Sequence, residues 1–288
     1  MKKNLFQIVA SGLLVFSSIL IVNAQPYIDI FSARYTNSPG LGNAGHGNNS
    51  TVLNYLNLST NLPFQFKNKK DVLILSPYFE RWSTQVQNAT GFSQYHYGLV
   101  LPVTLIKSIP HSSWSLQTTA IIRMNDATIS TRGQGQFGGA LVAANYRASH
   151  NLVYKFGVYL NGEFFGLFII PLVGIDWQIS NKTALFGILP ASMTLEHKLN
   201  NHFYAGATFR TFTNSYHDKD QSYIRIDENQ LGAFVDYYIT KHIVLNLEAG
   251  HSLFRKIRTG SRDDVKTNWN ANDNFYFKCM IAYRIRVR

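Results

Sequence analysis

The final segment of the chain, Asn274 to Arg288, alternates between two kinds of side chain. One alternate set is apolar: Phe275, Phe277, Cys279, Ile281, Tyr283, Ile285 and Val287. The other set is mostly polar and carries the cations Lys278, Arg284, Arg286 and Arg288. Successive side chains point to opposite faces in a β-strand, whereas a helix repeats every 3.6 residues. The segment is therefore predicted to be a strand in a wall between hydrocarbon and water.

The start of the chain has the layout of a cleaved secretory signal. A cationic start precedes an apolar stretch from Ile8 to Val22, and Val22-Asn23-Ala24 supplies small residues at its exit. This order predicts a signal peptide at residues 1–24 and a mature chain that begins at Gln25. A single membrane anchor is the alternative, because the apolar stretch is only slightly shorter than a spanning helix. The remainder, residues 25–288, is expected to form one domain.

The composition favours a membrane protein built from strands. Beyond residue 24 no apolar run approaches the ~20 residues that a membrane helix needs. The sequence contains 16 Tyr, 20 Phe and 20 Gly but only 15% charged residues, and soluble domains have about a quarter. The formal net charge is +11, yet lysines do not alternate with aromatics as on a nucleic-acid surface. We therefore expect no nucleic-acid partner, and place the excess charge in a polar lumen and on rims facing anionic lipid or lipopolysaccharide.

After Gln25 the chain repeats one unit, an alternating apolar and polar stretch followed by a break rich in Asn, Gly, Ser or Asp. The predicted strands in one direction are 27–36, 71–83, 113–127, 152–163, 183–189, 202–214 and 241–256. Their antiparallel partners are 51–66, 94–107, 137–149, 167–180, 191–199, 223–240 and 274–288. The pattern predicts an all-β fold, a transmembrane antiparallel up-and-down barrel of about 12–14 strands. Twelve is the alternative if Leu189-Pro190-Ala191 is a bend within one strand.

The breaks between the predicted strands fall into two classes that alternate along the chain. Short breaks lie at 67–70, 149–151, 180–182, 200–201 and 240–242. Mostly long ones lie at 37–50, 84–93, 128–136, 214–222 and 257–273. Short turns at one end and long loops at the other are typical of bacterial outer-membrane barrels. The pattern therefore predicts the cell outer membrane as location and the barrel-assembly machinery as a partner.

The predicted outward faces carry aromatic residues near the end with the short turns: Trp114, Tyr146, Trp177, Tyr237 and Tyr283. Their amphipathic rings favour the level of the lipid headgroups, so we interpret them as a girdle. The first strand is the exception to the pattern. Asp29 lies among Tyr27, Ile28, Ile30 and Phe31, and neither face is cleanly polar.

The histidines supply no clear catalytic or metal site. His251-Ser252 is the most suggestive pair, because hydrolases of the outer membrane place a His and a Ser on a barrel wall. Neighbouring residues in a strand point to opposite faces, however, so the two side chains are not expected to bond. His46, His197 and His202 lack metal-ligand spacing. We expect no catalytic residue, metal or cofactor.

Alternation places a set of charged residues on the inner face: Arg123, Arg147, Lys155, Asp176, Glu196, Lys198, Arg210, Asp236, Glu248, Lys278 and Arg284. In one interpretation these charges pair across the lumen and fill it. In the other, cations outnumber carboxylates and bias an open lumen toward small anionic solutes. Both interpretations remain open, because alternation identifies lining residues but not the width of the lumen.

Several short motifs carry a resemblance to a known family: Gly40-Leu41-Gly42-Asn43, Val52-Leu53-Asn54-Tyr55, Asn61-Leu62-Pro63-Phe64 and Ala282-Tyr283-Arg284. With the N-terminal signal, they resemble an uncharacterised outer-membrane β-barrel family of Bacteroidota. The resemblance covers nearly all of the mature chain and implies fold and location. It transfers no functional residues.

The expected role is passive, a porin-like transport barrel or a structural barrel with a net basic lumen, and not an enzyme. One alternative is an outer-membrane lipid-modifying hydrolase, which needs a Ser or Asp within hydrogen-bond reach of a His. Another is a surface adhesin that acts through its long extracellular loops, above all residues 257–273.

Overall fold

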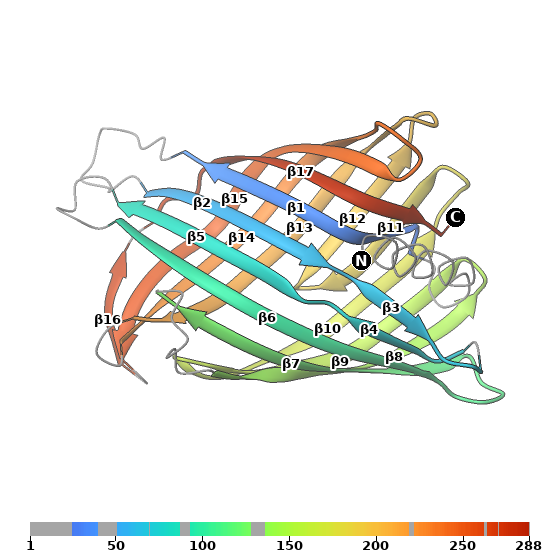
Figure 1. Ribbon diagram of the computed structural model, residues 1–288, viewed down its shortest axis with the longest axis horizontal. Helices are drawn as coiled ribbons and strands as arrows, with labels where there is room; N and C mark the ends of the chain where they lie inside the picture. Colours follow the sequence, from blue (N-terminus) through green and yellow to red (C-terminus); the bar gives the residue numbers. More distant parts are fainter. Residues whose placement is uncertain are drawn as a thin grey trace, which may run out of the picture.

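The protein is an all-strand barrel (Figure 1). The computed structural model describes residues 25–39, 51–68, 70–86, 93–127, 136–218, 222–261, 264–269 and 271–287. The first strands are β1 (Tyr27–Ser38), β2 (Thr51–Thr60), β3 (Leu62–Gln65), β4 (Val72–Leu75), β5 (Tyr78–Val86), β6 (Ser93–Ser108), β7 (Trp114–Asp126) and β8 (Gln136–Ser149). The others are β9 (Leu152–Glu163), β10 (Gly166–Gln178), β11 (Thr183–Leu189), β12 (Ser192–Lys198), β13 (Phe203–His217), β14 (Ser222–Tyr238), β15 (Ile243–Ser261), β16 (Asp264–Trp269) and β17 (Phe275–Arg286).

The wall closes because β17 pairs antiparallel with β1, the first strand of the chain. β2 and β3 together form one wall strand, and β4 and β5 form another. Among the described residues, β16 pairs with β15 and with no other strand. The described residues thus form a closed antiparallel barrel of 14 wall strands. β11 and β12 pair with each other from Thr183↔His197 to Ile188↔Ser192. The turn at Leu189–Ala191 is therefore a hairpin, and the twelve-strand alternative is wrong.

The two ends of the barrel differ. The chain termini of the described part and the short turns, such as 179–182 and 239–242, lie at what we call the turn end (Figure 1). At the opposite loop end, β13 continues to His217 and β15 to Ser261, beyond the predicted strand limits. β16 lies within the predicted loop 257–273, so part of that loop is a strand. No helix of the described residues is long and apolar enough to span a membrane.

The outer surface carries an apolar belt, as the alternation predicted. On the last strand Phe277 and Ile281 are 58% and 48% exposed, whereas Tyr276 and Arg284 are buried. Trp114, Tyr146, Trp177 and Tyr237 are also exposed, all toward the turn end. So many exposed large apolar side chains would be unfavourable in water, whereas a closed barrel in lipid requires them.

A β-bulge explains why polar and apolar residues do not alternate regularly in the first strand. The pairing of β1 with β17 shifts between Asp29 and Phe31, so one extra residue enters β1 there. Asp29 bonds to the buried Arg284, and beyond the bulge the inward side passes to Ser32 and Arg34. In the sequence, the change of phase shows only as the mixed faces of this strand.

The wall overlaps itself near the loop end. β11 and β12 stop at the Leu189–Ser192 hairpin, but β13 continues, and His217 pairs in parallel with Asp126 of β7. Ser215 lies on the face of β13 that points out of the barrel nearer the turn end. Its hydroxyl nevertheless donates to Glu163, which points inward from β9. The end of β13 therefore lies inside the β9–β10 hairpin. We call this overlap the seam.

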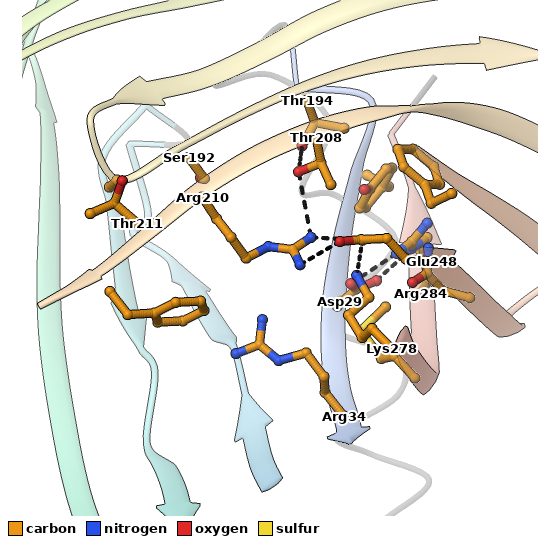
Figure 2. A pocket seen from close by; sticks show the side chains of 16 residues that line it. Asp29, Arg34, Ser192, Thr194, Thr208, Arg210, Thr211, Glu248, Lys278 and Arg284 are labelled. Carbon is orange, nitrogen blue, oxygen red and sulfur yellow. Dashed lines mark hydrogen bonds and ion pairs between the residues drawn. The ribbon is translucent and has the colours of Figure 1, made fainter. Parts of the chain in front are cut away.

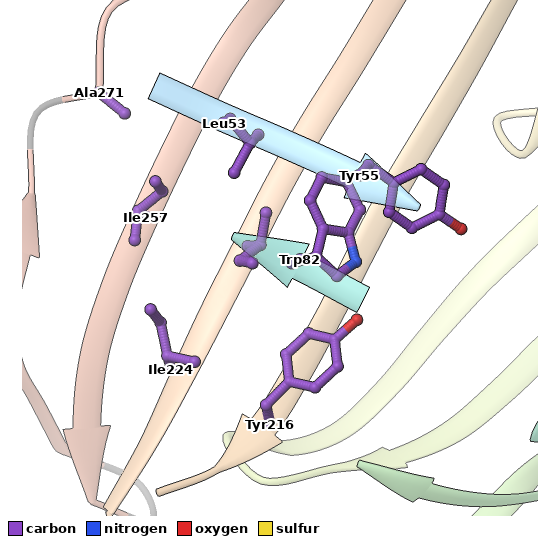
Figure 3. Packing of buried hydrophobic residues seen from close by; sticks show 8 residues of the cluster. Leu53, Tyr55, Trp82, Tyr216, Ile224, Ile257 and Ala271 are labelled. Carbon is purple, nitrogen blue, oxygen red and sulfur yellow. The ribbon is translucent and has the colours of Figure 1, made fainter. Parts of the chain in front are cut away.

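Buried apolar residues fill the barrel interior beside the seam (Figure 3). The cluster consists of Leu53, Tyr55, Trp82, Tyr216, Ile224, Ile226, Ile257 and Ala271. The Tyr55 and Trp82 rings pack with their centroids 4.2 Å apart, and Phe212 of β13 packs against both. This cluster lies in the lumen toward the loop end, and we call it the apolar plug.

Candidate functional site: the charged interior

The structure places most of the predicted lumen residues inside the barrel. Arg123, Asp176, Glu196, Asp236, Glu248, Lys278 and Arg284 are buried. The side chains of Lys155 and Arg210 are 14% and 12% exposed. Lys198 lines a cavity at the turn end. Arg147 is exposed near the end of β8, so the structure does not bring it together with the others.

Glu248 of β15 is the centre of one interior cluster. Its carboxylate accepts two hydrogen bonds from the Arg210 guanidinium, at 2.7 and 2.8 Å. It also accepts one from the Lys278 ammonium, at 2.5 Å, and one from the Tyr276 hydroxyl, at 2.7 Å. Two cations thus share a single carboxylate. Strands β13, β15 and β17 hold these groups together through their inward positions.

Arg284 of β17 is the centre of a second cluster. Its guanidinium donates to Asp29 at 2.5 and 3.0 Å and to Asp236 at 2.6 Å. Next along the strand on the same face, Arg286 pairs with Glu196 and donates to the Tyr238 hydroxyl at 2.9 Å. A guanidinium is a planar fork that suits such bidentate contacts with carboxylates. These pairs tie the last strand to β1, β12 and β14.

Three further buried carboxylates lie nearer the loop end, each with its own partners. Arg123 pairs with Glu163 at 2.9 Å, and Arg255 pairs with Glu228 at 2.6 Å. Glu80 accepts hydrogen bonds from the hydroxyls of Tyr216 and Tyr55, at 2.6 and 3.0 Å. All three carboxylates are buried. A buried carboxylate is tolerated only when paired or well bonded, and each of these is.

Sequence reasoning missed several interior residues: Asp29, Arg34, Glu80, Glu163, Glu228, Arg255 and Arg286. Glu163 follows Asn161 at the inward period of β9, so strict alternation to the end of the strand would have found it. Asp29 was hidden by the bulge. Glu228 lies at the inward period of β14, in phase with Asp236, so strict alternation along β14 would have found it too. The predicted count of seven cations against four carboxylates is therefore incomplete, because Asp29 and Glu163 are partners of Arg284 and Arg123.

Two interior cavities accompany these clusters. One of about 400 Å³, which we call the arginine cavity, is lined by charged residues that include Arg34, Arg210, Glu248 and Lys278 (Figure 2). The other, of about 610 Å³, lies at the turn end and is lined by Lys182, Glu196, Lys198 and Arg286 among others. Polar cavities of this size hold water or a small solute. The interior is therefore not completely filled by side chains.

Neither His251 nor His217 is paired with a serine hydroxyl of the described residues. The His251 ring nitrogen Nδ1 contacts the Ser252 carbonyl at 2.6 Å, whereas the Ser252 hydroxyl donates to the Asn274 carbonyl. His217 lies 3.9 Å from Asp126, but Ser215, the nearest serine along β13, donates to Glu163. Within the described ranges, no three His, Cys, Asp or Glu side chains could together hold a metal ion.

Residues 34–288 match a family model described as Domain of unknown function (DUF6268). The chain belongs to this family. Membership in DUF6268 agrees with the uncharacterised barrel family that the motifs resemble, although the match does not show an origin in Bacteroidota, which stays a prediction. No curated protein matches the sequence.

Among solved structures, an outer membrane channel from Pseudomonas putida F1 is 10% identical, with a TM-score of 0.45 over 93% of this chain and 98% of that chain. A mutant of TodX, a monoaromatic hydrocarbon channel, is 10% identical, with a TM-score of 0.37 over 88% of each chain. The β domain of the Bordetella autotransporter BrkA is 10% identical, with a TM-score of 0.31 over 88% of this chain and 97% of that chain. Likenesses this low assign no function to this DUF6268 member.

Proposed function

We propose that this protein is a passive barrel of the bacterial outer membrane that admits small solutes to its interior and catalyses no covalent reaction. The observation that carries the proposal is the polar interior, in which the arginine cavity and the cavity at the turn end remain among paired charges. Charges are tolerated there because they are matched or hydrated.

The outer membrane is the location that the outer surface supports. The apolar belt and the girdle of Trp114, Trp177 and Tyr237 fit a bilayer and its headgroup level. On this proposal the lipid partners are outer-membrane lipid and lipopolysaccharide, and the barrel-assembly machinery inserts the chain. The turn end faces the periplasm and the loop end faces the outside.

Passage of a solute through the barrel requires a conformational change near the loop end. The apolar plug lies in the lumen toward the loop end, so we expect no straight open pore through it. The seam beside it is held by side-chain contacts and the short β7–β13 bridge instead of a long ladder. We propose that the seam loosens when a solute passes.

The lumen has a bias toward anions on this proposal, although most of its cations are paired. Glu248 is shared by Arg210 and Lys278, and Arg34 has no carboxylate partner among the described residues. An excess of lining cations raises the local concentration of anions. The preference is expected to be modest, because the paired charges cancel at a distance.

Flux into vesicles tests the proposal. Liposomes that contain the refolded mature protein should swell in a small anionic solute such as sodium acetate faster than protein-free liposomes do. A barrel that is only structural, or one that acts as an adhesin, predicts the same rate in both preparations. A lipid-modifying hydrolase predicts release of fatty acid from the vesicle lipid, which the passive barrel does not.

A further inference from the structure

Arg34 of β1 is an interior cation with few partners. Its guanidinium donates one hydrogen bond, to the Tyr55 hydroxyl at 3.1 Å, and lies 4.8 and 5.5 Å from the ring centroids of Tyr55 and Phe212. Its Nε is buried without a hydrogen-bond partner. A guanidinium has five N–H donors, and leaving a buried donor unsatisfied is costly. Nη1 has no hydrogen-bond partner among the described residues, so its two N–H donors are the ones that a ligand can use.

The arginine cavity places Arg34 opposite other cations. Figure 2 shows Arg34 and Arg210 pointing into the cavity from different sides, with Lys278 near Glu248. Arg210 and Lys278 already share the one carboxylate of Glu248. Three cations thus meet here around one carboxylate, and mutual repulsion disfavours that arrangement unless an anion joins it.

Other charged groups around the cavity do not supply the missing partner. Asp29 from β1 and Asp236 from β14 are both engaged by Arg284. Glu80 from β5 reaches Arg34 only indirectly, since the Tyr55 hydroxyl donates to Glu80 and accepts from Arg34. No described carboxylate therefore contacts the Arg34 guanidinium directly.

The lining also offers hydroxyl groups and a limited volume. Ser192, Thr194, Thr208 and Thr211 line the same space as Arg34. The cavity measures about 400 Å³, which is in the range of sites for small molecules rather than for polymers. Phe212 supplies an apolar side to the cavity.

We propose that the arginine cavity is a binding site for a small anion with a carboxylate or phosphate group, and that the Arg34 guanidinium is its main contact. The planar fork of Arg34 matches two oxygens of such a group. Lys278 and the lining hydroxyls complete the contacts. The proposal rests on the proposed function only for the access of the anion to the interior.

Calorimetric titration of the refolded mature chain in detergent tests the site. Sodium phosphate and sodium acetate are titrated separately in a buffer without either group, and sodium chloride at equal ionic strength is the control for screening. We expect saturable binding of at least one of the two, which also separates the phosphate source from the carboxylate source. Arg34→Gln should weaken it about tenfold or more, since a charge-assisted contact is lost.

Two variants make the result interpretable. Arg147→Gln removes an exposed cation at the end of β8, outside the cavity, and should bind as the wild type does. Arg34→Lys keeps the charge but loses the planar fork, so it should bind the anion more weakly than the wild type and more tightly than Arg34→Gln. If Arg34→Gln folds poorly, the loss of affinity in Arg34→Lys still tests the site.

Unchanged affinity in Arg34→Gln or Arg34→Lys, or no saturable heat in the wild type, would overturn the site. Binding in detergent requires no transport. A barrel that binds the anion but admits no solute to vesicles would therefore contradict the proposed function and leave the site intact. A barrel that admits solute but binds no anion would contradict the site and leave the proposed function intact.

Discussion

At the scale of single residues, two consecutive residues of one strand lie in different environments, one on the apolar outer belt and one in the polar interior. Ile281 is 48% exposed on the outer belt, whereas Met280 lines the arginine cavity. The loss of unfolding free energy caused by a polar substitution therefore depends on whether the residue points outward or inward, more than on its place along the strand.

The pair Ile281→Arg and Met280→Arg measures this difference. Ile281→Arg should lower the free energy of unfolding by ~2–4 kcal/mol, because a cation then faces hydrocarbon. Met280→Arg should cost less, because its side chain enters a polar cavity, and its remaining cost comes from repulsion by Arg34, which pairs with position 280 across β1 and β17. Urea unfolding in lipid vesicles gives both values, and equal losses would contradict the assignment of the two faces.

Arg284 provides a second test at this scale. Arg284→Met leaves the buried Asp236 and the partly buried Asp29 without their cation, and loss of one partner of a buried ion pair costs about 3–5 kcal/mol. Arg147→Met removes an exposed cation and should change the unfolding free energy by less than ~0.5 kcal/mol. If unfolding showed the two variants to be equally stable, the ion-pair network would not be what secures the last strand.

At the scale of strands, alternation and turn composition predicted the number, direction and faces of the wall strands. The prediction of the hairpin at Leu189–Ala191 was correct because Pro and the period of the flanking strands are local signals. The seam was not predicted, because it depends on β13 meeting β7 and β9 across the barrel. One signal was present: the outward positions of β13 change from Phe209 to Thr211 and Thr213 where the strand passes behind β9–β10.

The interior site was predictable only in part for the same reason. Parity identified Arg210, Glu248 and Lys278 as lining residues, but it does not show which side chains meet across a lumen. Arg34 was missed because the bulge in β1 changes the phase between Asp29 and Phe31. A register defect of this kind leaves little trace in a single sequence.

A disulfide across the seam tests the proposed movement. Asp126→Cys with His217→Cys, in a Cys279→Ser background, places two thiols at paired positions of β7 and β13, close enough for a disulfide. Oxidation should reduce solute flux, and reduction should restore it. The matched pair Ala205→Cys with Val235→Cys lies within the β13–β14 ladder and should leave flux unchanged when oxidised. Equal flux through the oxidised and reduced seam would show that the seam does not move.

At the scale of the whole molecule, the account joins an apolar outside, a paired and partly hollow inside, and a loop end filled by an apolar plug. The N-terminal signal belongs to this scale too, although residues 1–24 lie outside the described residues and their cleavage stays a prediction. Mass spectrometry of protein isolated from membranes should find Gln25 as the first residue. A chain that retains Met1 would instead support the membrane anchor.

The central claim, that solutes pass through this barrel, is tested most directly by single-channel recording of the refolded mature protein across a salt gradient. The account predicts discrete conductance steps that switch between open and closed, with a reversal potential that shows a modest preference for anions. Arg34→Gln should reduce that preference, whereas Arg147→Gln should not. A bilayer with inserted barrels but no conductance steps would contradict the claim and favour a structural barrel, and a preference for cations would contradict the proposed bias of the lumen.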